Sequence, residues 1–230
     1  MPDLKVMMFY KKRNPFCQYA EFILKSHFHE DDILLVSGNL GDPLPEDLAW
    51  YNPEYVISFL SPWIIPKQLL GIAKTAAINF HPGSPDYPGT GCYNLALYEG
   101  AAKYGVTVHH MKERVDTGNI IMTAYFETAA YDTVESLKLK SMNRLLSCFE
   151  EIAALIAKNA PLPQSEEHWR REPFTRKRML ELFEIDPARH GEEEVRRRIR
   201  ASAYPGCEGA CVTVAGHKFF YPIDKREPIA

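Results

Sequence analysis

Three side chains in the middle of the chain have the types needed to transfer an acyl group to an amine: Asn79, His81 and Asp116. The histidine can take a proton from the attacking ammonium, because the pKa of imidazole lies near the working pH. The asparagine amide can donate a hydrogen bond to the oxyanion of the tetrahedral intermediate. The aspartate can orient the imidazole, stabilise its charged form or hold a relay water. If the amine attacks the donor directly, this chemistry needs no nucleophilic serine or cysteine.

The spacing of these residues predicts that they meet. Asn79 and His81 are two residues apart at the end of a predicted strand, 76–80, so their side chains point to the same face. In an open α/β sheet, ligands bind at the carboxyl ends of the strands, where this pair lies. The loop 82–91 is rich in proline and glycine and can hold backbone groups close to a ligand. Asp116 follows a later predicted strand.

The elements that position these side chains alternate along the first half of the chain. Short apolar runs predict strands at 4–10, 32–36, 55–60 and 76–80, and helical spacing predicts helices at 16–27 and 67–72. This alternation predicts βαβ crossovers and a parallel sheet covered on both faces. Beyond the loop, we expect a helix at 94–103 and strands at 106–111 and 119–126. A long helix is expected to start at Asp132, with Glu135 placed as in a capping box.

Composition changes after the Pro161-Leu162-Pro163 break. Residues 166–200 are rich in charge and predict two helices, and 210–214 with 217–221 predict a hairpin. The predicted fold class is therefore α/β: a Rossmann-like, mostly parallel sheet flanked by helices, with a small C-terminal α+β subdomain ending in a β-hairpin. We expect a catalytic domain at 1–165 and the subdomain at 166–230. The hairpin either forms a dimer interface or caps the main sheet.

The overall composition limits the class of function. The 230 residues are 46% hydrophobic and carry a formal net charge of −3, which argues against nucleic acid as the principal ligand. Neither a secretory signal nor an apolar run long enough for a bilayer is found, so we expect a cytoplasmic protein without a membrane partner. Five cysteines without a CxxC pair argue against disulfides and against a metal site. We interpret the C-terminal arginine clusters as solvated helix faces paired with glutamates.

Several motifs follow one another in a fixed order: INFHPG at 78–83, YPGTG at 87–91, GVTVHHM at 105–111 and VDTGNII at 115–121. This combination resembles the folate-dependent formyltransferase family, which includes methionyl-tRNA, glycinamide ribonucleotide and amino-sugar formyltransferases. The hallmark of that family is Asn-x-His, followed by Asp-x-Gly after a Gly-Val-Thr strand. Many members read Ser-Leu-Leu-Pro where this chain has Gly83-Ser84-Pro85-Asp86, and the variant here is most similar to members that act on sugar nucleotides.

The resemblance implies a formyltransferase that uses 10-formyltetrahydrofolate, with Asn79, His81 and Asp116 catalytic and no metal. It also implies that the pterin of the donor lies against the segment after the third strand and against the turn before Asp116. Apolar walls with backbone donors and acceptors suit a flat heteroaromatic ligand. The implied donor-binding residues are Phe59, Leu60, Ser61, Trp63, Ile64 and Val115. For Phe59 and Trp63, the alternative is a role as core aromatics only.

The implied acceptor is the amine of an amino-deoxysugar linked to a nucleoside diphosphate, as used in making lipopolysaccharide and other surface glycans. Cations at a strand-to-helix turn could meet the diphosphate, and polar groups beyond the loop could touch the sugar. The candidates are Lys12, Arg13, Asn14, Tyr93 and Asn94. Three alternatives stay open: methionyl-tRNA formylation, a hydrolase that deformylates the folate, and a non-catalytic formyl-folate-binding module. A homodimer through the C-terminal region is a further expectation.

Overall fold

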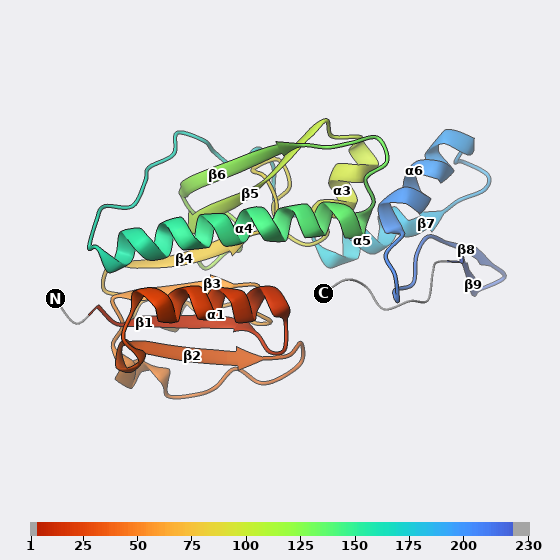
Figure 1. Cartoon of the computed structure of the whole chain (residues 1–230). Helices are drawn as coiled ribbons and strands as arrows, with labels where there is room; N and C mark the ends of the chain where they lie inside the picture. Colours follow the sequence, from red (N-terminus) through yellow and green to blue (C-terminus); the bar gives the residue numbers. More distant parts are fainter. Residues whose placement is uncertain (1–3, 223–230) are drawn as a thin grey trace.

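A six-stranded sheet in the order β2-β1-β3-β4-β5-β6 lies at the centre of the molecule (Figure 1). The structure, a computed structural model, describes residues 4–222. The strands of this sheet are β1 (Val6–Lys11), β2 (Ile33–Gly38), β3 (Tyr55–Phe59), β4 (Ala76–His81), β5 (Lys103–His110) and β6 (Ile120–Glu127). The helices between and after them are α1 (Pro15–His27), α2 (Lys67–Leu70), α3 (Cys92–Glu99) and α4 (Val134–Ala157), with short 3-10 turns η1 (Glu30–Asp32) and η2 (Leu48–Tyr51). This order confirms the predicted α/β class.

The sheet is parallel only in its first four strands. β2, β1, β3 and β4 run parallel, whereas β5 is antiparallel to β4 and β6 is antiparallel to β5. The register places His109 of β5 directly opposite Asn79 of β4. The pairing of β5 with β6 shifts between Val108 and His109, a bulge of the kind that re-aims a side chain. Because of the reversal, the end of β5 lies beside the middle of β4, with His110 opposite Ile78, whereas His81 at the end of β4 lies opposite Thr107.

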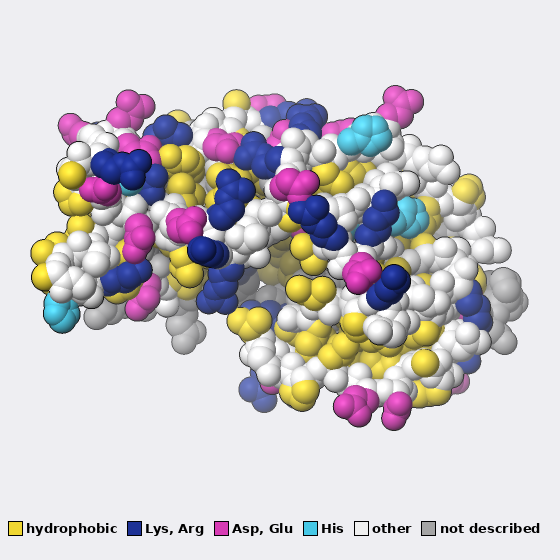
Figure 2. All heavy atoms as spheres, turned by 180° about the vertical axis from the view of Figure 1, so that it is seen from behind, with side chains coloured by type: hydrophobic (Ala, Val, Ile, Leu, Met, Phe, Trp, Pro, Cys, Tyr) yellow, Lys and Arg dark blue, Asp and Glu magenta, His cyan; other side chains and the backbone are white. Residues whose placement is uncertain are grey.

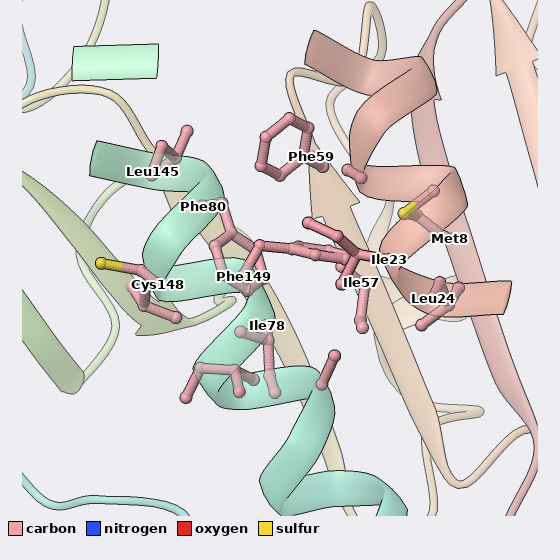
Figure 3. Close-up of a cluster of buried hydrophobic side chains, with 14 of the residues drawn as sticks. Met8, Ile23, Leu24, Ile57, Phe59, Ile78, Phe80, Leu145, Cys148 and Phe149 are labelled. Carbon is pink, nitrogen blue, oxygen red and sulfur yellow. The ribbon is translucent and has the colours of Figure 1, made fainter. Parts of the chain in front are cut away.

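Alternate residues of the strands face two separate cores. On one face, α1 and α4 lie side by side and cover a cluster that includes Phe59, Phe80 and Phe149 (Figures 1 and 3). The ring centroids of these phenylalanines are 5.0 to 5.8 Å apart, which is typical of tilted and edge-on aromatic packing. The other face carries Met7, Phe9 and Val56 under the connecting segments. Because side chains alternate along a strand, Asn79 and His81 point away from the Phe80 side.

Two boundaries differ from the sequence prediction. The helix expected at 94–103 begins at Cys92 and ends at Glu99, because Gly100 takes a left-handed conformation (φ +68°) that ends the helix and leads into β5. The helix expected to start at Asp132 is capped by Thr133 instead. Its hydroxyl accepts from the Ser136 amide and the Ser136 hydroxyl accepts from the Thr133 amide, so the capping box is formed by these two residues rather than by Asp132 and Glu135.

The C-terminal elements form a small layer beside α3. They are α5 (Arg176–Phe183), β7 (Glu184–Ile185), α6 (Glu192–Ser202), β8 (Cys211–Val214) and β9 (His217–Phe220). The predicted hairpin β8–β9 exists, but it pairs with β7 in a separate three-stranded sheet and does not cap the central one. The arginines of α6 pair with Glu192 and Glu194, as expected for a solvated helix face. The boundary between 165 and 166 stays a prediction.

Candidate active site

A cavity of about 300 Å³ opens at the carboxyl ends of β3 and β4. It is lined by residues from the ends of both strands, from the loop after β4 and from the turn after β5, namely Ser58, Leu60, Ser61, Trp63, Ile64, Ile65, Asn79, Phe80, His81, Pro82, Gly89, Thr90, His109, Met111, Lys112, Val115 and Asp116. Asn79, His81 and Asp116 therefore share one cavity. This is the edge of a parallel sheet at which ligands are expected to bind.

Asp116 is the centre of a hydrogen-bonded cluster. Its Oδ2 accepts from the Gly89 amide at 2.7 Å and lies 3.3 Å from Nδ1 of His81. Its Oδ1 lies 3.2 Å from Nε2 of His109 and accepts from the Asn79 amide at 3.4 Å. The carboxyl group is only 7% exposed, and its backbone has a positive φ of 47°. The turn thus holds one buried carboxylate in contact with every other polar group of the cluster.

The charge of Asp116 is stabilised by its neighbours against the effect of burial. Burial by itself raises the pKa of this carboxyl group. His81, His109 and the Gly89 amide act in the opposite direction, and together they hold the pKa of Asp116 well below its usual range. The carboxylate is therefore ionised at neutral pH.

His81 is held between a carbonyl and this carboxylate. Its Nε2 lies 2.9 Å from the Tyr87 carbonyl oxygen, which can only accept, so Nε2 must carry a proton. Its Nδ1 faces Asp116 and forms an ion pair when it is protonated too. Gly83 permits this placement, because a Cβ there would lie 2.5 Å from Nε2 of His81. With Nε2 protonated at Tyr87, Nδ1 beside Asp116 is the nitrogen of His81 that can take a further proton.

His109 belongs to the cluster, although its sequence position gave no role to it. Its Nδ1 donates to the carbonyl of His110 at 2.9 Å, so Nε2 either accepts from the Asn79 amide at 3.0 Å or, when it carries a proton, donates to Oδ1 of Asp116 at 3.2 Å. The side chain is 2% exposed. Neighbouring residues of a strand face opposite sides, and of the two adjacent histidines only His109 lines the cavity. The signal that could have identified His109 is its place opposite Asn79 in an antiparallel pair.

Gly118 allows the turn to close on β5. A Cβ at this position would lie 1.7 Å from the carbonyl oxygen of His110, so no other residue fits without moving the backbone. The carbonyl of Gly118 accepts from the indole N–H of Trp169 at 2.8 Å. The close approach therefore fixes Asp116 and His109 against each other.

Trp169 is a second residue that sequence reasoning missed. It belongs to residues 161–175, which return from the end of α4 across the loop after β4; we call this segment the strap. The ring of Trp169 lies edge-on to His81 and to His109, with centroid distances of 5.7 and 5.0 Å. The strap is fixed to the loop by backbone hydrogen bonds from Arg170 to Pro85, from Phe174 to Pro88 and from Thr90 to Phe174. Trp169 thus covers the two imidazoles on the side of the strap.

The predicted donor-binding residues divide into two groups. Leu60, Ser61, Trp63, Ile64 and Val115 line the cavity, and a left-handed Leu60 (φ 51°) turns the chain at the end of β3. The Phe59 side chain does not reach the cavity, because period-two alternation places it in the core against Phe80 and Phe149 (Figure 3). The alternative of a core aromatic therefore holds for Phe59, whereas Trp63 both lines the cavity and packs edge-on against Phe9 of the core.

The predicted acceptor-binding residues do not line this cavity. Lys12 and Arg13 are exposed on the loop after β1, and Asn14 caps α1 by accepting from the Cys17 amide. Tyr93 and Asn94 lie at the start of α3 and line a second cavity. Between residues 4 and 222, no group of histidine, cysteine and acidic side chains is arranged to hold a metal ion. Over the same range, no helix has the length and apolarity required to cross a membrane.

Comparison with known proteins places this site in a family. Residues 37–146 match the model of the formyl transferase domain. GDP-perosamine N-formyltransferase of Brucella melitensis is 28% identical over 179 residues, which are 76% of this chain and 66% of that protein. Methionyl-tRNA formyltransferase of Ehrlichia ruminantium is 32% identical over 155 residues, which are 67% of this chain and 49% of that protein. The chain thus spans from about half to about two thirds of these curated relatives.

Solved structures share the fold along nearly the whole chain. A sugar N-formyltransferase from a Shewanella species has a TM-score of 0.76 at 17% identity, covering 97% of this chain and 98% of that one. An N-formyltransferase from Helicobacter canadensis, solved with folinic acid and dTDP-3-aminofucose, has a TM-score of 0.68 at 20% identity, covering 94% and 86%. The motifs, the domain match and the shared fold agree. Residues 37–146 of this chain form a formyl transferase domain.

Proposed function

We propose that the protein transfers a formyl group from 10-formyltetrahydrofolate to the amine of an amino-deoxysugar linked to a nucleoside diphosphate. The observation that carries this proposal is the cluster around Asp116, which places Asn79, His81 and His109 at one cavity beside an apolar wall. Relatives that formylate a sugar nucleotide and a neighbour crystallised with dTDP-3-aminofucose support the choice of acceptor.

In the proposed reaction, the amine nitrogen bonds to the formyl carbon and the carbonyl electron pair moves to the formyl oxygen. The Asn79 amide donates to that oxyanion, and a protonated His81 adds positive charge beside it. Collapse of the tetrahedral intermediate breaks the bond between the formyl carbon and N10 of the folate. No covalent enzyme intermediate forms.

The amine attacks in its unprotonated form and becomes an ammonium in the tetrahedral intermediate. One proton must then move from this nitrogen to the leaving N10. Nε2 of His109 and the carboxylate of Asp116 are the two acceptors of the cluster, and they lie 3.2 Å apart. We therefore propose that this pair accepts the proton and returns it to N10, while the N–H of His81 at Tyr87 keeps the ring in place. Asn79, His81 and Asp116 keep their proposed catalytic status, with His109 added.

The donor fits the wall formed by Leu60, Trp63, Ile64 and Val115. These side chains offer apolar surface, and the turn at Ser61 and Trp63 is fixed by bonds of the Ser61 hydroxyl to the Trp63 backbone. Such a rigid apolar slot with nearby backbone groups suits a pterin ring. For the acceptor, we keep Lys12, Arg13, Tyr93 and Asn94 as proposed contacts, whereas the side chain of Asn14 is used as a helix cap.

Two finer points belong to the same proposal. We place the enzyme in the cytoplasm, in the synthesis of a surface glycan such as lipopolysaccharide, because sugar nucleotides are made and consumed there. We also propose a homodimer through the C-terminal hairpin. Its support is a set of exposed apolar side chains at Val214, Phe219, Phe220 and Tyr221, on a sheet whose edge strand β9 pairs with β8 alone among the described residues.

Formylation of methionyl-tRNA is the second candidate, because the Ehrlichia relative is the more similar in percentage identity. The two candidates are separated by one assay. The protein is incubated with 10-formyltetrahydrofolate and either a panel of dTDP-, UDP- and GDP-linked amino sugars or methionyl initiator tRNA, and the mass of each acceptor is measured. A gain of one CO on a sugar nucleotide supports the proposal. Modification of tRNA alone, loss of formyl to water, or binding of the folate without turnover would each refute it.

A further inference from the structure

A second cavity of about 480 Å³ lies on the other side of the loop after β4. Its walls come from the start of α3, the first turns of α4, the helix α5 and the chain after α6, namely Tyr93, Asn94, Val134, Lys138, Arg176, Met179, Leu180, Phe183, Ser202, Tyr204, Cys207 and Glu208. None of these residues lines the first cavity. The proposed reaction centre leaves this cavity without a role.

The two cavities are close neighbours along the chain. Thr90 lines the first cavity and Tyr93 lines the second, so three residues, at most about 11 Å of chain, separate their walls. Gly91 between them approaches Met179 of the second cavity so closely that a Cβ there would lie 2.7 Å from its sulfur. A nucleoside-diphosphate sugar is longer than this separation when it is extended. The walls of the two cavities are therefore closer together along the chain than the length of one such molecule.

The lining of the second cavity has the chemistry of a nucleotide site. Val134, Met179, Leu180 and Phe183 supply an apolar wall, and the ring of Tyr93 adds a flat surface beside it. Among the described residues, the Tyr93 hydroxyl has no hydrogen-bond partner, so it is free to bond to a ligand. An aromatic base with polar edges matches this combination.

Two cations stand at the same cavity. Arg176 has no ion pair among the described residues, and the Lys138 ammonium donates only to the Tyr204 hydroxyl, at 2.8 Å. Glu208 is the one carboxylate in the lining. The lining is therefore net positive by one charge, although the chain as a whole carries −3. A net positive lining favours the approach of an anion. Lysine and arginine side chains also surround a hollow on the face of the molecule that Figure 2 shows.

We propose that the second cavity binds the nucleoside diphosphate of the acceptor, with the base against Tyr93 and Phe183 and the diphosphate between Lys138 and Arg176. This assignment rests on the proposed function and specifies how its substrate is held. It places the sugar over the loop between the cavities, with its amine directed to the Asp116 cluster. It also changes the role of Tyr93 from a sugar contact to a base contact, and it gives the diphosphate to Lys138 and Arg176 in place of Lys12 and Arg13.

Cys207 provides a direct test, because it is the exposed cysteine of the cavity lining, whereas Cys17, Cys92, Cys148 and Cys211 are buried. The rate at which a thiol reagent labels Cys207 in the whole folded chain is measured with GDP, UDP, dTDP, pyrophosphate or folinic acid added. We expect at least one nucleoside diphosphate to slow labelling about tenfold, with pyrophosphate weaker. No protection by any nucleotide at millimolar concentration, or protection by folinic acid alone, would overturn the proposal.

Matched variants on α5 locate the binding. Arg176→Gln is expected to weaken nucleotide binding about tenfold by calorimetry, and Leu180→Trp is expected to block it by filling the cavity from its rim. Lys177 is exposed, lies next to Arg176 and does not line the cavity, so Lys177→Gln and Lys177→Trp should bind normally. Equal affinities of all four variants would place the nucleotide elsewhere.

The binding experiments need no formyl transfer, so the two proposals can fail separately. If sugar nucleotides are formylated with KM unchanged in Arg176→Gln and Leu180→Trp, only the assignment of the second cavity is wrong. If nucleotides protect Cys207 but no sugar is formylated, the cavity assignment holds as a nucleotide site and the proposed reaction is wrong.

Discussion

Asp116 shows how one residue depends on its surroundings. Its folded pKa is depressed, so its charge contributes stability that is fully present above the unfolded pKa of about 4 and is lost as pH falls through the folded value. We expect Asp116→Asn to lower the free energy of unfolding by about 2 kcal/mol at pH 7. The difference from wild type should shrink below about pH 4. Urea unfolding of both proteins between pH 3 and 7 measures it, and a difference that does not depend on pH would contradict the ion-pair account.

Asn79 is predicted to act on the transition state rather than on binding. Asn79→Ala removes one donor to the oxyanion, which typically costs about 10²–10³ in kcat, while KM for the folate stays within a few-fold. Steady-state kinetics with the acceptor identified above tests this. The control is Ser84→Ala, a buried polar residue of the loop that does not line the cavity. If KM rises and kcat is unchanged in Asn79→Ala, the side chain binds substrate only.

Among single residues, the sequence identified those that belong to a local motif and missed those that only the tertiary structure brings to the cavity. Asn79, His81 and Asp116 share a cavity because strand period and strand end follow from local sequence. His109 was missed because its position depends on β5 running antiparallel to β4. Trp169 was missed because nothing in 161–175 indicates that the chain returns to the sheet edge. Phe59 was predicted to bind the donor, but the alternation of side chains along β3 directs it into the core.

The strap is the element whose docking completes the walls of the cluster. Trp169→Ala removes two ring contacts, each worth about 0.5–1.5 kcal/mol, so we expect kcat to fall about tenfold. Water would reach His81 and His109, so the pH profile of kcat should shift as well. Trp169→Phe keeps a ring but loses the bond to Gly118, and it should recover most of the activity. Equal activity of Trp169→Ala and wild type at every pH would show that the strap has no positioning role.

The start of α4 gives a prediction about stability. The hydroxyl of Thr133 caps the helix, so Thr133→Ala should cost about 1 kcal/mol and lower Tm by roughly 2–4 °C. Thr133→Ser keeps the hydroxyl and should be close to wild type. Calorimetry of the three proteins measures the shift. The sequence pointed to Asp132 as the cap because Asp132 and Thr133 are neighbours, and propensity alone does not choose between neighbours that can both cap.

For the molecule as a whole, the hairpin makes the oligomeric state testable. If its exposed apolar side chains bury each other across two copies, the protein should elute as a dimer and Phe219→Lys with Phe220→Lys should convert it to a monomer. Light scattering coupled to size-exclusion chromatography reads the mass directly. The control is Leu40→Lys, an exposed apolar residue on the loop after β2. A wild-type monomer at all concentrations would disprove the dimer.

Most of the architecture followed from periodicity, since buried parallel strands and amphipathic helices have strong local patterns. The antiparallel direction of β5 could not be predicted in this way, because a strand buried on both faces has the same composition in either direction. The two-residue strand β7 was missed for a similar reason: Glu184 and Ile185 pair with β8 only because α5 and α6 bring them there. The second cavity also depends on the packing of α5 and α6, so no local sequence motif predicts it.

The strap also sets the order in which the protein can become functional. The Asp116 cluster draws its residues from 79 to 116, yet the ring that covers it comes from Trp169, after the whole of α4. A chain leaving the ribosome therefore exposes Asn79, His81 and Asp116 well before their cover exists. In refolding, the docking of the strap must follow the pairing of β4 with β5. Because Trp169 then contacts two imidazoles, its fluorescence should report this last step separately from formation of the sheet.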